Sequence, residues 1–517
     1  MDLKSDFEIF IGVVAPLGTE RKWFLKTLKE KFSLSNYLTE EISITDEMIK
    51  FTSNDNKALS FEYFVKMEIC NELRKNYSNG FLMGIVINKI RKLRKNKNKK
   101  VVYIIDQIKN VNEYNVLSHV YGLNYIQISL FSNENYRDGN LKVKFKNDCV
   151  KSLANYKFEL KKVGFYDASM HENISNLFGE ISANIHNKFE AEILPDVTHN
   201  LIKKDFNEIA GDSKLNGQQV SDLFHLSHYF FNLDDSKVNI FKEINKFFSL
   251  VEGNNEDYPT QDEFGMSLAF QVSVRSNFPN NRHIGASIIS PYGEVISVAS
   301  IRAPCPTSNP TLFDQYQVQD GYMAYKDKIT KWKNFLTECH KKFDHLDYEE
   351  KNTLHDISNF LKDSLDFHPC THAEIAAIID AAKLGVSVRN STLYTTTFPC
   401  HLCAKEIINA GISKVVYLEA YPKSKNKELY PKLIDFDPSH PSSLLPFCFY
   451  SGVGPKRLMY VYSVKNKNKH SKPPPLIAYE RSCYYERKES DILSYLSPTK
   501  PKHLDFLNSL FKREDDS

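Results

Sequence analysis

The sequence predicts an α/β protein with more than one domain. Its 517 residues exceed the length of one typical domain and predict two or three. Buried-type apolar strands alternate with stretches of helical periodicity, first near the amino terminus and again after residue 370, which is typical of α/β folds. With 42% hydrophobic residues, the chain can form substantial cores for these elements.

The amino-terminal region opens with a buried-type strand and a glycine-bearing turn over residues 7–19, and residues 21–32 then have helical periodicity. Strand, turn and helix in this order are the arrangement of a P-loop, in which backbone N–H groups at a helix start bind phosphate. Gly12 and Gly18 bracket the turn, but Thr19 stands where the motif has lysine. This degenerate P-loop favours nucleotide sensing or assembly over phosphoryl transfer.

A further apolar strand over residues 100–106 ends in Asp106, as does the magnesium-holding strand of P-loop proteins. Residues 121–128 predict another strand. The alternative for these features is an ordinary α/β core without a ligand. The candidate nucleotide-binding residues of this region are Gly12, Gly18, Thr19 and Asp106.

Residues 151–255 predict a polar, helical connector. His225 and His228 have the spacing of helix-face ligands there, but such histidines are more often core or surface residues, and we assign them no metal. A new region begins just after the connector with a capped helix start, followed by a β-hairpin over residues 282–299. Residues 305–370 then form a long, largely helical insert.

The residues that carry chemistry lie between His372 and Cys403. Residues 374–384 have helical periodicity and end at a glycine, so His372 and Glu374 lie at a helix start. A β-branched strand follows, and a second helix opens at Cys400. Two helix starts that face each other can bring one histidine and two cysteines around one metal ion.

The expected metal is zinc, held by three protein ligands: His372, Cys400 and Cys403. Three ligands leave a fourth position for water, whose pKa zinc lowers to about 7 in catalytic sites. Glu374 would carry the proton of this water to a ring nitrogen, in the signature of zinc deaminases that act on cytosine or adenine. A closed, structural zinc site is the alternative, with Cys370 or His401 as the fourth ligand.

Four stretches around the predicted ligands extend the likeness, namely residues 371–374, 393–400, 414–417 and 421–424. In them the sequence resembles the cytidine and deoxycytidylate deaminase family, and more closely its bacterial anti-phage dCTP deaminases. The resemblance implies an amino-terminal P-loop kinase-like α/β domain and a carboxyl-terminal cytidine-deaminase-like α/β/α domain with a mixed sheet. The domains expected from it are a degenerate P-loop NTPase or kinase-like domain (1–150), the connector (151–255), a zinc-dependent CMP/dCMP-type deaminase domain with its insert near 305–370 (256–465) and a tail (466–517).

The resemblance also implies hydrolysis of a free deoxycytidine nucleotide, dCTP to dUTP and ammonia, which depletes dCTP in antiviral defence. A triphosphate needs cations, and the candidates are Arg282, Arg302 and Lys423. The family carries an asparagine that contacts the sugar, whereas Ile301 or Arg302 stands there in this chain. The preferred nucleotide therefore stays open. The alternatives are a dCMP deaminase, an RNA or single-stranded DNA cytidine deaminase, and a zinc-bearing nucleotide sensor that has lost turnover.

Composition narrows the expected partners and compartment. Sixty-seven basic and 64 acidic residues give a net charge of +3, which does not favour general nucleic-acid binding. No apolar run or signal-peptide layout predicts a membrane partner, and the nine cysteines are odd in number and scattered, as reduced thiols are. We expect a cytoplasmic homo-oligomer that acts on a free nucleotide, with a nucleotide effector at the amino-terminal domain.

Overall fold

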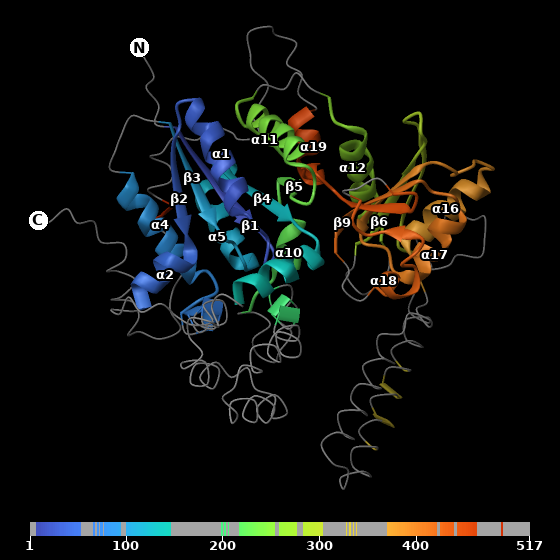
Figure 1. Ribbon diagram of the computed structural model, residues 1–517, viewed down its shortest axis with the longest axis horizontal. Coiled ribbons are helices and arrows are strands. Elements are labelled where there is room, and N and C mark those ends of the chain that lie inside the picture. Colours follow the sequence, from blue (N-terminus) through green and yellow to red (C-terminus); the bar gives the residue numbers. More distant parts are fainter. Residues whose placement is uncertain are drawn as a thin grey trace, which may run out of the picture. The chain divides into compact units, whose positions relative to one another are not determined.

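The computed structural model divides the chain into two compact units, each of which contains a six-stranded sheet (Figure 1). The first unit comprises Met1–Tyr258 and Ser451–Ser517, and the second comprises Pro259–Tyr450. The structure describes residues 7–52, 77–94, 100–145, 217–253, 258–276, 283–302, 370–420, 424–438 and 442–462, with parts of 66–75, 198–205, 327–338 and 488–489. Most of the predicted insert and of the predicted tail lies outside the described residues.

The sheet of the first unit has β1 near its centre, with strand order β12-β5-β4-β1-β3-β2. Five of its strands are parallel: β1 (Phe7–Val14), β2 (Leu38–Ser43), β3 (Lys100–Asp106), β4 (Tyr125–Phe131) and β5 (Tyr229–Asn232). Strand β1 is a nearly continuous apolar run that is buried from Glu8 to Val14, as expected of a parallel strand with both faces covered. The strands predicted over residues 7–14 and 100–106 are thereby confirmed.

The first unit also contains helices. The helix predicted to follow β1 is present as α1 (Figure 1). The predicted strand at residues 121–128 begins later than expected, because Tyr121 ends α5 and residues 122–124 form a short 3-10 helix before β4. Helix α5 begins at a capping box formed by Asn110 and Glu113. The helices of this unit whose full bounds are given include α1 (Lys22–Leu34), α2 (Ile44–Thr52), α4 (Phe81–Leu93), α5 (Val111–Tyr121), α10 (Val220–Phe224), α11 (Lys237–Val251) and α19 (Pro455–Tyr462).

Gly12 does not border the turn after β1, where the sequence placed it. It lies inside the strand, and a side chain there would collide with the ring of Tyr125 on β4. Gly18 does lie in the turn, with a φ of +85° that favours glycine. Gly12 therefore allows two strands to approach closely, whereas Gly18 forms the turn. The kinase-like nature of this unit stays a prediction.

The chain returns to the first unit after residue 450, whereas the sequence placed this segment in the deaminase region. Strand β12 (Gly452–Val453) pairs antiparallel with β5 at the sheet edge, and the Gly454 N–H donates to the His228 carbonyl. Further along, Glu489 is fully buried and accepts two hydrogen bonds from Arg94, which also donates to Glu8. Carboxyl-terminal residues therefore form part of the core of this unit.

The second unit has a mixed sheet of order β10-β11-β9-β8-β6-β7. The antiparallel hairpin β6–β7 confirms the hairpin predicted from the sequence, and β8, β9, β11 and β10 run parallel to one another. The strands are β6 (Gly285–Ile289), β7 (Val295–Ser300), β8 (Thr392–Thr397), β9 (Lys414–Glu419), β10 (Ile434–Asp435) and β11 (Leu445–Phe449). The predicted mixed α/β fold is confirmed.

Helices lie on both faces of this sheet (Figure 1). Helix α12 (Gln261–Ser273) begins at a capping box and packs so closely on β8 that a side chain at Gly265 would meet the ring of Tyr394. Helix α16 (Ala373–Lys383) covers the other face, where Ser297 of β7 donates to the Ala377 carbonyl. Helices α17 (His401–Asn409) and α18 (Asn426–Leu429) follow β8 and β9. Among the described helices, none has both the length and the hydropathy of a membrane span.

His228 is a buried histidine of the first unit, and it has no metal-ligand partner among the described residues. Its Nδ1 accepts a hydrogen bond from the Gln127 N–H, and Arg457 lies 3.3 Å from its Nε2. Burial, with the neighbouring positive charges of Arg457 and Lys456, lowers the pKa of His228 to about 3. His228 is therefore a core residue, one of the two environments, core or surface, that the sequence left open.

A neutral His228 makes the first unit lose stability as the pH falls. Below a pH of about 6.5 the unfolded chain binds a proton that the folded chain does not bind until about pH 3, so the loss approaches 1.4 kcal/mol per pH unit. His228→Asn keeps an acceptor for Gln127 without a titrating group, and we expect a weaker pH dependence. Denaturant unfolding between about pH 5 and pH 8 measures it, and identical slopes in both proteins would contradict the prediction.

A candidate metal centre at two helix starts

His372 occupies the amino-terminal cap of α16, with extended backbone dihedrals of −66° and 152°. The residue before it, Thr371, forms a two-way backbone bridge with Arg302, just beyond the end of β7. The His372 carbonyl accepts the N–H of Ala376 in the first turn of the helix. The end of a strand and the start of a helix together fix where the imidazole leaves the backbone.

Cys400 caps α17 in the same way, and Cys403 lies on the first turn of that helix. The connection from β8 is held by the Phe398 N–H, which donates to the Glu419 carbonyl at the end of β9. The Pro399 carbonyl accepts two hydrogen bonds, from Ser424 Oγ at 3.0 Å and from the buried Asn426 Nδ2 at 2.9 Å. The sequence did not predict this support, because neither side chain is near the thiols in sequence.

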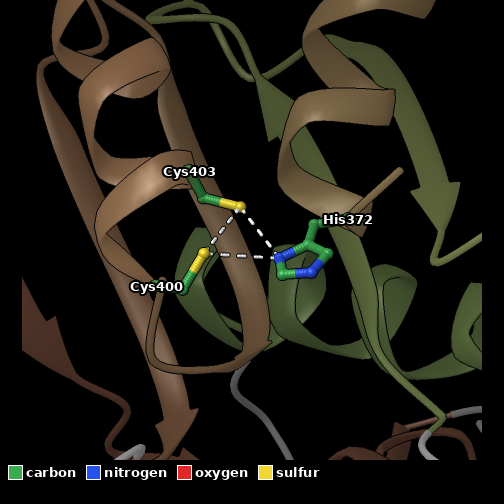
Figure 2. Close-up of side chains that lie close together, drawn as sticks. All are labelled: His372, Cys400 and Cys403. Atoms are coloured by element: carbon green, nitrogen blue, oxygen red, sulfur yellow. Dashed lines mark hydrogen bonds between the residues drawn. The ribbon is translucent and has the colours of Figure 1, made fainter. Parts of the chain in front are cut away.

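The three predicted ligands meet in space, with His372 Nδ1 turned toward both sulfur atoms (Figure 2). Nδ1 lies 3.4 Å from Cys400 Sγ and 3.3 Å from Cys403 Sγ, and the two sulfur atoms are 3.5 Å apart. A point equidistant from the three atoms is about 2.0 Å from each, close to Zn–N and Zn–S bond lengths of about 2.0–2.3 Å. His372, Cys400 and Cys403 would therefore hold a zinc ion.

The protonation of these groups also fits a cation. The pKa of Cys400 falls to about 4, first through the hydrogen bond between its sulfur and that of Cys403, and further through His372, against the opposing effect of burial. Burial alone would lower the pKa of His372, but hydrogen bonds with Cys370 and Cys400 raise it to about 11. Binding of a metal ion by these groups would release the protons that they carry in its absence.

Glu374 lies on the first turn of α16, is 3% exposed, and places Oε2 3.6 Å from Cys403 Sγ. Burial raises the pKa of its carboxyl group, and the charge of His372 opposes this rise. Among the described residues, His372, Cys400 and Cys403 lie close enough together to bind one metal ion. Glu374 is not part of this group. Glu374 is thus beside the centre and outside its ligand set, as a proton carrier must be.

The predicted substrate contacts are only partly described. Arg282 and Lys423 lie outside the described residues. Arg302 forms a two-fold ion pair with Asp380 of α16, at 2.7 and 2.8 Å, so its guanidinium already has a carboxylate partner. Ile301 is 4% exposed, and its buried apolar side chain cannot bind a sugar hydroxyl.

Comparison with known proteins identifies the family. Residues 259–419 match the family described as "Cytidine and deoxycytidylate deaminase zinc-binding region". The deoxycytidylate deaminase of Enterobacteria phage T4 is 50% identical over 173 residues, which cover 31% of this chain and 78% of the relative. The chain belongs to the cytidine and deoxycytidylate deaminase family. The resemblance of the sequence to this family is confirmed, and the chain is a zinc-dependent hydrolytic nucleotide deaminase.

Two further deaminases each match about a third of the chain. The deoxycytidylate deaminase of Enterobacteria phage T2 is 29% identical over 173 residues, covering 31% of this chain and 80% of the relative. The crystal structure of dCMP deaminase from the cyanophage S-TIM5 in complex with dCMP and dUMP matches 34% of this chain and 94% of its own, at 18% identity and a TM-score of 0.21.

Zinc content tests whether the centre is open or closed. His372→Ala and Cys400→Ser each remove one ligand, and we expect the purified variants to lose most of the roughly one zinc ion per chain of the native protein. Cys370→Ser is the matched control, because the Cys370 thiol forms a hydrogen bond with His372 but is not one of the three metal ligands. It should keep its zinc, as elemental analysis can measure. Loss of zinc from Cys370→Ser would instead indicate a closed, four-ligand site.

Proposed function

We propose that the chain hydrolyses the 4-amino group of a free deoxycytidine nucleotide, with dCTP as the preferred substrate. The products are dUTP and ammonia, since one water molecule is consumed and the C4–N bond is broken. The observation that carries this proposal is a ligand triangle of His372, Cys400 and Cys403 with the buried Glu374 carboxyl group 3.6 Å from one of its sulfur atoms.

Zinc, when bound, supplies a Lewis acid that makes water nucleophilic near neutral pH. The chain itself supplies the proton transfers. Glu374, whose pKa burial raises, accepts a proton from the attacking water, donates it to the ring nitrogen, and then helps the amino group leave as ammonia. The site is buried, so few waters compete for these protons.

The proposal that the substrate is a free nucleotide rests on the net charge of the chain and on its similarity to known deaminases. A chain with a net charge of +3 lacks the strongly basic character of proteins that hold a polynucleotide strand. The phage relatives are named deoxycytidylate deaminases, which favours dCMP as the second candidate substrate. The preference for dCTP, and a role in antiviral defence by depletion of this precursor, rest on the resemblance of the sequence to the bacterial anti-phage enzymes.

Glu374→Gln and Glu374→Ala test the role of the carboxyl group. We expect ammonia release to fall about a thousandfold while zinc content stays unchanged, because the proton carrier is lost and the ligands are kept. Glu406→Gln is a matched control, since Glu406 lies on α17 and pairs with Lys405 outside the centre. Mass spectrometry of dCTP, dCMP, cytidine and a cytosine-containing oligonucleotide identifies the substrate. A zinc-loaded native protein that deaminates none of them would support the nucleotide-sensor alternative.

Arg302 tests the phosphate contact proposed for the triphosphate. If its guanidinium binds phosphate, Arg302→Met should raise the KM for dCTP about tenfold and leave that for cytidine unchanged, because a charge-assisted hydrogen bond is lost. Asp380→Asn is the control, since it weakens the ion pair and keeps the arginine. Steady-state kinetics separates the cases. Equal effects of both variants on every substrate would show that the pair only holds α16 to the end of β7.

A further inference from the structure

The turn between β1 and α1 in the first unit contains a buried carboxylate that comes from a distant part of the chain. Asp205 is 1% exposed, and its Oδ2 accepts a hydrogen bond of 2.6 Å from the Leu17 N–H. Its Oδ1 accepts a hydrogen bond of 2.7 Å from Lys109 Nζ, which also donates to the Ala15 carbonyl. Both oxygen atoms of Asp205 are thus bound by groups that typically bind anions.

Two buried cations interact with the charge of this carboxylate. Burial lowers the pKa of Lys109, and the charge of Asp205 opposes that effect more than any other group does. Arg137 is 7% exposed and donates to the carbonyl groups of Ser132 and Leu17. Its pKa is also lowered by burial, with Asp205 the leading opposing charge. An anion at this position therefore compensates for two cations that lie away from water.

The turn has further features of an anion site. Thr19 is 4% exposed, and its hydroxyl group has no hydrogen-bond partner among the described residues. Gly18 has a positive φ, and a side chain there would collide with the Arg137 carbonyl. The P-loop motif has a lysine where this chain has Thr19. Here the ammonium group of Lys109, from beyond the end of β3, reaches the turn and donates to the Ala15 carbonyl.

We propose that the turn between β1 and α1 is an anion-binding site whose resident anion is the carboxylate of Asp205. The chain supplies its own ligand there, and an external phosphate group is excluded while Asp205 stays in place. Asp106, another of the predicted nucleotide-binding residues, already has a partner, because Arg21 donates two hydrogen bonds to it at 2.8 and 2.9 Å. The first unit in this state is thus closed to nucleotide phosphates at this turn.

Asp205→Ala in the full-length, zinc-loaded protein removes the resident anion and leaves a space of its size. We expect the melting temperature of the first unit to fall by about 10 °C, because Lys109 loses its buried partner. Formate or acetate at about ten times its dissociation constant should restore about 3 °C, since either fits the space of the deleted carboxylate. Sodium chloride at the same ionic strength should restore nothing. Differential scanning fluorimetry measures both effects.

Two controls keep this test decisive. Asp262→Ala removes a partly exposed carboxylate that pairs with Lys414, and formate should not stabilise this variant. The native protein should gain no stability from formate or inorganic phosphate beyond that from chloride. Stabilisation of the native protein by phosphate, lost in Lys109→Met, would overturn the proposal, and so would an Asp205→Ala protein that responds to neither formate nor acetate.

Asp205→Asn covers the case in which the alanine variant does not fold. It keeps the shape of the side chain and removes its charge, so we expect faster hydrogen exchange in the peptide that contains the Leu17 N–H. Formate should not slow this exchange, because the amide fills the space. Exchange equal to that of the native protein would show that the charge of Asp205 is not needed at the turn and would overturn the proposal.

Discussion

Three donor atoms, the Nδ1 of His372 and the Sγ atoms of Cys400 and Cys403, lie within 3.5 Å of one another, and this arrangement depends on the register of the second unit. The two helices that carry them start from separate strands, through a bridge at Thr371 and a hydrogen bond at Phe398. A shift of one residue in either connection would move a ligand to the opposite side. The sheet therefore acts as the rigid support on which a buried cation can be held.

Much of this centre could be predicted because its signals are local in the sequence. Helix starts, a glycine after each helix and the spacing of His372, Cys400 and Cys403 are set within about thirty residues. The central strands were also predictable, since long apolar runs such as β1 are typical of parallel sheets. Gly12 was misplaced for a different reason. A glycine that makes room for Tyr125 on a neighbouring strand has the same sequence signal as one that makes a turn.

The partners of buried charges could not be predicted. Asp205 meets Lys109 across 96 residues, and Glu489 meets Arg94 across 395. Both carboxylates lie in polar stretches, which as sequence are typical of surface segments. A charged side chain is buried only where another segment supplies its counter-charge, and composition carries no information about that pairing. The same holds for Ser424 and Asn426, whose support of the Pro399 carbonyl depends on how the chain returns.

The return of the chain to the first unit bears on how the protein can be made. During translation, β5 is synthesised more than two hundred residues before β12. The edge of the first unit's sheet therefore lacks its last strand until the whole second unit has been synthesised. A fragment that stops at Tyr258 would have a bare strand edge and an Arg94 with one carboxylate instead of two. The second unit is an insertion within the sequence of the first unit. Producing the second unit alone is therefore a simpler way to obtain an independent domain than ending the chain at Tyr258.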